Sequence, residues 1–291
     1  MSRVERIETR RTKLTEGLVI SRALPTRQQR MVGAWCFLDH IGPIRFEPGG
    51  RMQIGAHPHT CLQTFTWVID GEILHRDSLG SEQVIRPLQV NLMTAGRGVA
   101  HTEESLSSGS TLHAAQLWIA LPEAEKDCTP AFDHYPDLPG WEDGGCIFTL
   151  LAGSYGGRVA PTRLHSPLVG MDVSCSSRSD IELHLDPGFE YGMLILEGGV
   201  MIENEHFDRE GFAYIAKGGT KATLELHAGS RILIIGGEPF DKPVLMWWNF
   251  VGFSHEEIAK AQHDWESGDP RFGFVKGSEG RRLEAPELSL S

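Results

Sequence analysis

The sequence predicts an all-β protein built from two tandem barrels, with one short helix near the C-terminus. Short strand patterns separated by turns fill most of the chain, which contains 33 Gly and 16 Pro among 291 residues. A hydrophobic run ending in an acidic residue and Gly occurs twice, at 65–71 and at 192–198. Only one segment, after residue 254, has a clear helical pattern. Frequent short strands in both halves favour sandwich or barrel domains.

The first half of the chain contains a succession of short strands. We expect them at 17–21, 35–37, 63–69, 73–76, 84–85, 90–93, 99–103 and 112–121. Asp70-Gly71 is a hairpin signal between two of these strands. The segment 130–145 is rich in Pro, Asp and Gly, which is typical of a linker or surface loop. We therefore expect one domain over 1–135 and a second over 136–291.

The second half resumes with strand patterns from 147–151 through to 231–235. The helix signal follows them. Ser254 and Glu257 have the spacing of a capping box, and Gly268 can end the helix. Apolar and amide side chains recur at helical spacing between these ends, at Ile258, Ala261, Gln262 and Trp265.

Composition limits the classes of function. The formal net charge of −12 argues against direct binding to nucleic acid, although it permits a basic protein partner. No apolar stretch approaches the roughly 20 residues of a membrane helix, and no apolar segment of a signal peptide follows the basic N-terminus. The five cysteines are scattered without a C-x-x-C motif, which fits a reduced, cytoplasmic protein.

Two short motifs carry the strongest chemical signal, His57-Pro58-His59 and His101-Thr102-Glu103. Alternate residues of a strand point to the same face, so each motif can direct two side chains at one point. Three imidazoles and a carboxylate suit a divalent first-row transition metal. The sequence therefore predicts a metal site inside the first barrel.

The internal repeat predicts that the second barrel lacks an equivalent site. Superposing 65–71 on 192–198 without gaps puts His184 in the place of His57 and Asp186 in that of His59. A similar superposition of glycines puts Thr223 in the place of His101. Because two imidazoles are lost, we expect no transition metal in the second half.

The segments around these motifs resemble the pirin family of the cupin superfamily over nearly the whole chain. The most specific is the run from Met93 to Glu103, which reads Met-Thr-Ala-Gly-Arg-Gly-Val-Ala-His-Thr-Glu. The other matching segments are 37–40, 56–59, 117–118 and 271–273. The resemblance implies a bicupin fold, with two barrels of the jelly-roll or double-stranded β-helix type.

The resemblance also implies a mononuclear metal held by His57, His59, His101 and Glu103. Fe(II) is the expected ion, with Mn, Co, Ni, Cu and Zn as alternatives. Some pirins are described as oxidising the flavonol quercetin with dioxygen, and others as redox-sensitive cofactors of transcription regulators. We therefore expect a small planar aromatic substrate and O2, and keep a regulatory protein partner as the alternative. A metal-dependent isomerase or a sugar-binding cupin also remains open. A two-barrel chain can be self-sufficient, so we expect a monomer.

Glu103 is the expected catalytic residue, because it is the ligand that can accept a proton if it loosens from the metal. Gln63 and Cys61 share strand parity with His57 and His59, so they can line the pocket if the strand stays regular. Gln63 stands where the family commonly has Glu, and its neutral side chain should favour the ferrous ion.

Two further histidines have weaker claims on the site. His40 follows Asp39 and can line the mouth of the pocket. We expect His75 to lie outside the barrel or behind the ligands.

Overall fold

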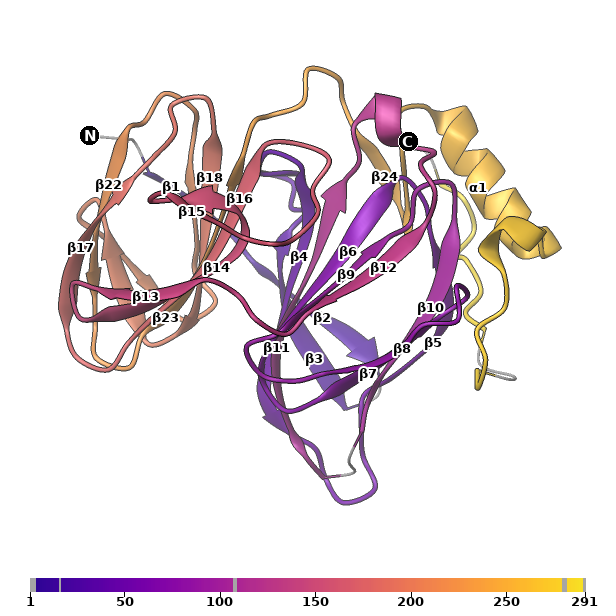
Figure 1. The fold of residues 1–291 in the computed structure, drawn as a ribbon, viewed down its shortest axis with the longest axis horizontal. Helices are drawn as coiled ribbons and strands as arrows, with labels where there is room; N and C mark the ends of the chain where they lie inside the picture. The colour runs from indigo at the N-terminus through magenta and orange to yellow at the C-terminus, as the bar shows by residue number, and fades with distance from the viewer. Residues whose placement is uncertain (1–3, 16, 107–108, 279–281, 290–291) are drawn as a thin grey trace. The chain divides into compact units, whose positions relative to one another are not determined.

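The computed structural model describes residues 4–15, 17–106, 109–278 and 282–289 (Figure 1). Contacts divide the chain into two compact units. The first-barrel unit comprises residues 13–20, 41–136 and 240–291, and the second-barrel unit comprises residues 1–12, 21–40 and 137–239. Both are built from antiparallel strands, so the predicted all-β class is confirmed.

The strands fall into two large and two small sheets, besides one two-stranded ribbon. The larger sheet that carries most of the first barrel has the order β12 (Ala131–Tyr135), β9 (Val90–Thr94), β6 (Leu62–Asp70), β11 (Thr111–Ala120), β4 (Trp35–Arg45), β3 (Leu18–Leu24) and β2 (Arg10–Thr15). The smaller sheet of this barrel has the order β5 (Gln53–His59), β10 (Val99–Ser105), β7 (Ile73–Asp77) and β8 (Glu82–Ile85). The division between the two units falls within β2, β3 and β4.

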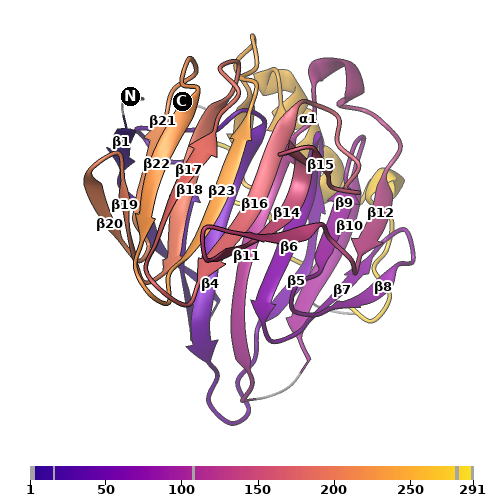
Figure 2. The ribbon, with the colours of Figure 1, turned by 60° about the vertical axis from the view of Figure 1, so that its left-hand side comes forward.

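The second-barrel unit repeats the arrangement of a large and a small sheet. The large sheet has the order β1 (Val4–Ile7), β21 (Phe212–Ile215), β18 (Glu190–Glu197), β23 (Arg231–Gly237), β16 (Leu168–Cys175), β14 (Cys146–Tyr155) and β13 (Gly140–Asp143), and β15 (Arg158–Val159) pairs with β14. The small sheet has the order β17 (Ser179–His184), β22 (Lys221–Leu226), β19 (Gly199–Ile202) and β20 (Glu205–Asp208). Figure 2 shows β18, β23, β16 and β14 side by side.

The expected boundary at residue 135 divides the chain into two continuous halves. In the structure, contacts place each end of the chain in the unit formed mainly by the other half of the sequence. The N-terminal strand β1 pairs with β21, which places residues 4–7 in the second-barrel unit. The C-terminal segment joins the first-barrel unit, where Phe250 forms a parallel bridge with Thr60. Strand pairing between distant residues, which alternation along the chain does not encode, sets this grouping.

The C-terminal segment contains a two-stranded ribbon, β24 (Leu245–Trp247) and β25 (Phe250–Gly252), followed by helix α1 (His255–Ser267). Ser254 caps the helix by accepting a hydrogen bond from the Glu257 backbone amide, and Gly268 ends it in the left-handed conformation with φ 76°. The predicted helix and both of its ends are confirmed. Two 3-10 turns, η1 (Glu123–Glu125) and η2 (Pro270–Phe272), complete the regular elements of the part of the chain that the structure describes. Among the described residues, no helix is long and apolar enough to cross a membrane.

The C-terminal segment packs on one face of the small sheet through an apolar cluster that includes residues of α1. Ala56 of β5 and Ala100 of β10 pack in one apolar cluster with Ile258 and Trp265 of α1. Successive strand residues point to opposite faces, so the neighbours of these alanines point away from the helix. Those neighbours include His57 and His101.

Candidate metal centre

His57 and His59 lie on β5 at alternate positions and are buried, with 6% and 1% exposure. His57 Nδ1 lies 2.8 Å from the Gly55 carbonyl oxygen, and His59 Nδ1 lies 3.2 Å from that of Asn249. A carbonyl oxygen only accepts, so each Nδ1 carries a proton and donates it. In the neutral imidazoles Nε2 therefore holds the lone pair that a metal needs.

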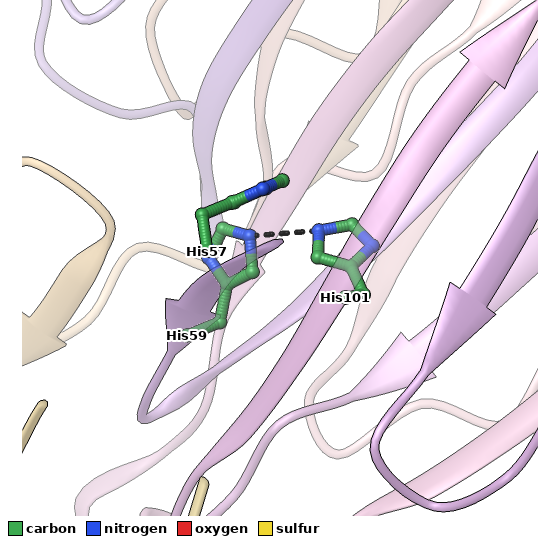
Figure 3. Close-up of side chains that lie close together, drawn as sticks. All are labelled: His57, His59 and His101. Carbon is green, nitrogen blue, oxygen red and sulfur yellow. Dashed lines mark hydrogen bonds between the residues drawn. The ribbon is translucent and has the colours of Figure 1, made fainter. Parts of the chain in front are cut away.

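His101 on β10 is the direct cross-strand partner of His57. Its Nε2 lies 3.1 Å from His59 Nε2, and the three imidazole rings have centroid separations of 4.3 to 5.0 Å (Figure 3). One ring nitrogen from each of the three histidines lies within 4.8 Å of the others. The two strands thus bring together the three imidazoles that the sequence predicted as ligands.

Burial keeps the three imidazoles neutral. Desolvation lowers the pKa of His57 to about 4, against a smaller opposing effect of the hydrogen bond to Gly55. Burial, followed by the proximity of His57, holds the pKa values of His59 and His101 well below the usual range. A neutral imidazole is the form that ligates a metal, so this donor set fits a divalent transition ion at neutral pH.

Glu103 lies two residues after His101 on β10, but a β-bulge separates them in the pairing with β5. Its carboxylate falls in a second cluster with His75 and His101, and not in the cluster of His57, His59 and His101. Burial raises the pKa of Glu103 to about 7, against a smaller lowering by Thr66, whose hydroxyl lies 3.4 Å away. His101 therefore has two buried acidic neighbours, Glu103 on its own strand and Asp77 directly opposite on β7.

His75 is more central than the sequence suggested. It is buried on β7, directly opposite Glu103 of β10, and its Nδ1 lies 3.3 Å from His101 Nδ1. The expectation that it lies outside the barrel is wrong, whereas a place behind the ligands agrees with the structure. The spacing of His75 and Asp77 was the available signal, since it matches that of the two ligand motifs.

The premise for placing Gln63 and Cys61 is wrong, because the strand does not stay regular. β5 ends at His59, Cys61 has a positive φ of 58°, and β6 begins at Leu62. Gln63 is fully buried and donates a hydrogen bond to the Thr94 hydroxyl at 2.9 Å. Parity with the histidines therefore gives no support for either residue as part of the pocket.

Burial and nearby acidic groups set the chemistry of Cys61. Its side chain is buried, and burial raises the pKa of its thiol to about 12, with added contributions from Glu257 and Asp127. Cys61 therefore stays protonated and has the character of a packing residue.

His40 is buried on β4 opposite Ser21, in the second-barrel unit. It belongs to neither of the histidine clusters found among the described residues. Its expected role at the mouth of the pocket stays a prediction.

Aromatic side chains surround the cluster. Trp118 of β11 meets His59 edge to face at a centroid separation of 5.0 Å. Phe132 of β12 stacks on His75 at 4.4 Å, with the ring planes 15° apart. These apolar rings limit hydration of the imidazoles and hold their planes, which strengthens electrostatic interactions inside the barrel.

The equivalent positions of the second barrel do not converge. His184, Asp186 and Thr223 are all exposed. Thr223 pairs with Glu182 and not with His184, so the pairing differs by two residues from that of His101 and His57. His184 and Thr223 alternate with the buried Leu183, Ala222 and Leu224, so they lie on the outer face of the smaller sheet. The gap-free superposition of the sequence did not capture this orientation.

Comparison with known proteins places these features in one family. Residues 17–119 match the Pirin family model, and residues 170–273 match the model of the Pirin C-terminal cupin domain. A protein of Pseudomonas aeruginosa named "Putative quercetin 2,3-dioxygenase" is 56% identical over 285 residues, which cover 98% of this chain and 90% of that protein. A "Pirin-like protein" of Caulobacter vibrioides is 35% identical over 86% of this chain and 88% of that protein.

The crystal structure of a quercetin 2,3-dioxygenase from Acinetobacter baumannii superposes with a TM-score of 0.96 at 45% identity, covering 98% of this chain and 96% of that one. The cupin architecture of both barrels, expected from the sequence, is thereby confirmed. This chain belongs to the pirin family.

Proposed function

We propose that this protein is a metal-dependent dioxygenase that oxidises quercetin or a related flavonol with O2. The observation that carries the proposal is the convergence of His57, His59 and His101 as buried, neutral imidazoles, with one ring nitrogen of each within 4.8 Å of the others. The names of the A. baumannii and P. aeruginosa relatives support the choice of substrate class.

His57, His59, His101 and Glu103 are the proposed ligands of a single divalent ion. Three nitrogen donors and one carboxylate suit Fe(II), and they also accept Mn, Co, Ni, Cu or Zn. Four protein ligands leave positions open on an octahedral ion. A bound ferrous ion would supply Lewis acidity toward the substrate hydroxyl and redox chemistry toward dioxygen.

In the reaction, the protein's own side chains hold the metal through neutral imidazoles and accept one proton from the substrate. In the metal-free protein, desolvation raises the pKa of Glu103 to about 7, so the carboxylate can take up a proton near neutral pH when it is released from the metal. Its Oε1 faces the Thr66 hydroxyl, which in turn donates to Gln116 Oε1 at 2.9 Å. We assign Glu103 two roles, ligand of the metal and acceptor of the proton that the flavonol hydroxyl gives up.

The test begins with anaerobic purification and metal analysis, followed by addition of quercetin and air while absorbance and oxygen are recorded. We expect metal-dependent loss of the flavonol band with consumption of oxygen. Metal-free protein and His101→Ala should be inactive. His184→Ala, which changes an exposed histidine of the second barrel, should be fully active.

Turnover that is independent of metal or unaffected by His101→Ala would overturn the proposal. Bound iron without turnover of any flavonol would favour the alternative, a redox-sensitive cofactor of a transcription regulator. The acidic net charge of −12 would then suit a basic surface on the regulator.

A further inference from the structure

A hydrogen-bonded row of three side chains runs from Asp77, the last residue of β7, through His75 to His101 of the proposed metal centre. His75 Nε2 lies 3.1 Å from Asp77 Oδ2, and His75 Nδ1 lies 3.3 Å from His101 Nδ1. Asp77 and His75 belong to β7, and His101 to the adjacent β10. Each of the three is buried, with at most 3% of its surface exposed.

Backbone amides hold the Asp77 carboxylate in place independently of His75. Its Oδ1 accepts hydrogen bonds from the backbone amides of Leu79 and Ser81, both at 2.9 Å. Oδ2 is then the oxygen that faces His75. Burial alone would raise the pKa of Asp77, but hydrogen bonds from His75 and Ser81 lower it, so the carboxylate is anionic and acts only as an acceptor.

An anionic acceptor at one end determines the proton positions along the whole row. His75 must carry its proton on Nε2 to donate to Asp77, which leaves a lone pair on Nδ1. His101 must then donate from Nδ1 to His75, which leaves the lone pair of His101 on Nε2. That is the nitrogen 3.1 Å from His59 Nε2 in the proposed metal centre.

We propose that Asp77 and His75 are positioning residues that fix His101 in the Nδ1–H form and so prepare Nε2 to ligate the metal. This inference rests on the proposed metal site. His57 and His59 obtain the same tautomer from backbone carbonyls, which no side-chain substitution removes. Two side chains, His75 and Asp77, set the tautomer of His101. Substitution of a residue that does not itself bind the metal can therefore change the tautomer of this ligand. The stacking of Phe132 on His75 holds the middle ring of the row.

The first test needs no metal. Nitrogen-15 NMR of the metal-free protein assigns the tautomer of each histidine. We expect His75 as the Nε2–H form and His101 as the Nδ1–H form. Asp77→Asn retains an oxygen for the Leu79 and Ser81 amides but presents an amide donor to His75. That variant should reverse both tautomers and leave a proton on His101 Nε2. An Nε2–H His101 in the wild-type protein, or an unchanged tautomer in Asp77→Asn, would overturn the inference.

The second test measures the affinity of the protein for Co²⁺ by competition with a chelator. Loss of an outer-sphere partner typically weakens metal binding by about 10–100-fold, and we expect this range for Asp77→Asn. Asp77→Asn affinity within about 3-fold of the wild type would contradict the inference.

Two substitutions of His75 separate positioning from packing. His75→Asn keeps an oxygen near the place of Nδ1 that can accept from His101, whereas His75→Leu has similar size and no acceptor. We expect His75→Asn to bind Co²⁺ nearly as the wild type does and His75→Leu to bind about 10–100-fold more weakly. Equal loss in both variants would show that His75 itself ligates the metal or only packs, and either result would refute the positioning role.

The matched control is the same pair of substitutions at His134. This half-buried histidine of β12 lies in the same unit and is hydrogen-bonded to Asn91 at 2.7 Å. It takes no part in the hydrogen bonds that join Asp77, His75 and His101. Both control variants should retain wild-type affinity for Co²⁺. A wild-type protein that binds no Co²⁺ and oxidises no flavonol would refute the proposed function. The tautomers measured by NMR would still decide whether Asp77 and His75 fix the tautomer of His101.

Discussion

Replacement of Glu103 by Gln gives the sharpest test of how burial governs this site. Burial raises the pKa of Glu103 from its ordinary value of 4.5 to about 7 in the folded, metal-free protein. A carboxyl group whose pKa is higher in the folded state contributes fully to the free energy of unfolding below pH 4.5, and this contribution is lost as pH rises through 7. The metal-free protein should therefore lose stability over this interval because of Glu103.

The size of the effect follows from the two pKa values. At about 1.4 kcal/mol for each pKa unit, the full loss at high pH is about 3 kcal/mol, and about 2–3 kcal/mol of it falls between pH 5 and pH 8. Gln has nearly the same shape and keeps an oxygen that can face the Thr66 hydroxyl, but it does not ionise. Relative to the wild type, metal-free Glu103→Gln should thus gain about 2–3 kcal/mol of unfolding free energy between these pH values.

The assay is equilibrium urea unfolding of both chelator-treated proteins at pH 5 and pH 8. His57, His59 and His101 are present in both proteins, so their contribution cancels in the comparison. Their pKa values are lowered, so they stabilise the folded state above about pH 6.5, and this stability is lost as pH falls, through about 4 for His57. A pH dependence that is the same in wild type and Glu103→Gln would refute the argument that Glu103 is desolvated.

Metal binding provides an independent measurement of the same group. Metal binding to the wild type at pH 6 should release close to one proton from Glu103, because a group with pKa about 7 is then about nine-tenths protonated. Glu103→Gln should release almost none, since the neutral histidines have no proton to displace. Calorimetry of Co²⁺ binding in buffers of different ionisation enthalpy reports the number of protons. Equal release by both proteins would mean that Glu103 does not bind the metal.

Three further predictions concern other parts of the first barrel. His101→Ala should weaken metal binding by more than the about 10–100-fold that loss of an outer partner costs, as measured by metal analysis after dialysis, and retained stoichiometric metal would contradict its role as ligand. Gln63→Glu should lower the midpoint potential of the iron in a redox titration, because a buried negative charge favours the ferric ion; an unchanged potential would remove Gln63 from the vicinity of the metal. Gly96→Ala should destabilise the protein by about 1–3 kcal/mol or more in urea unfolding, since Gly96 has φ 48° and an added Cβ would lie 2.0 Å from the Cys128 carbonyl oxygen; wild-type stability would show that this turn can relax.

Local patterns of the sequence were sufficient to predict several structural elements. The capping residues Ser254 and Gly268 delimit the helix as predicted, because caps act on backbone groups within one turn. The strand carrying His57 and His59 was recognisable from its i, i+2 spacing, since alternation is a property of a single strand. The family motif from Met93 to Glu103 added the cupin architecture, which periodicity alone does not specify.

Other expectations failed where distant parts of the chain decide the conformation. Parity of Gln63 with the histidines assumed one continuous strand, but the chain turns at Cys61 with a positive φ. That turn is held by hydrogen bonds from the Cys61 amide to Gly96 and from the Leu121 amide to the Cys61 carbonyl. No window of sequence around residue 61 contains these partners.

The sequence by itself determined that two strands carry a His-x-His and a His-x-Glu motif and that the chain is all-β with one capped helix. Only the tertiary structure decided that His101 lies opposite His57, that His75 and Asp77 stand behind His101, and that Glu103 is desolvated. The physical reason is that side-chain alternation and capping are short-range, whereas cross-strand register and burial depend on which strands pair. The pKa values, the tautomers and hence the reactivity of the site follow from that pairing.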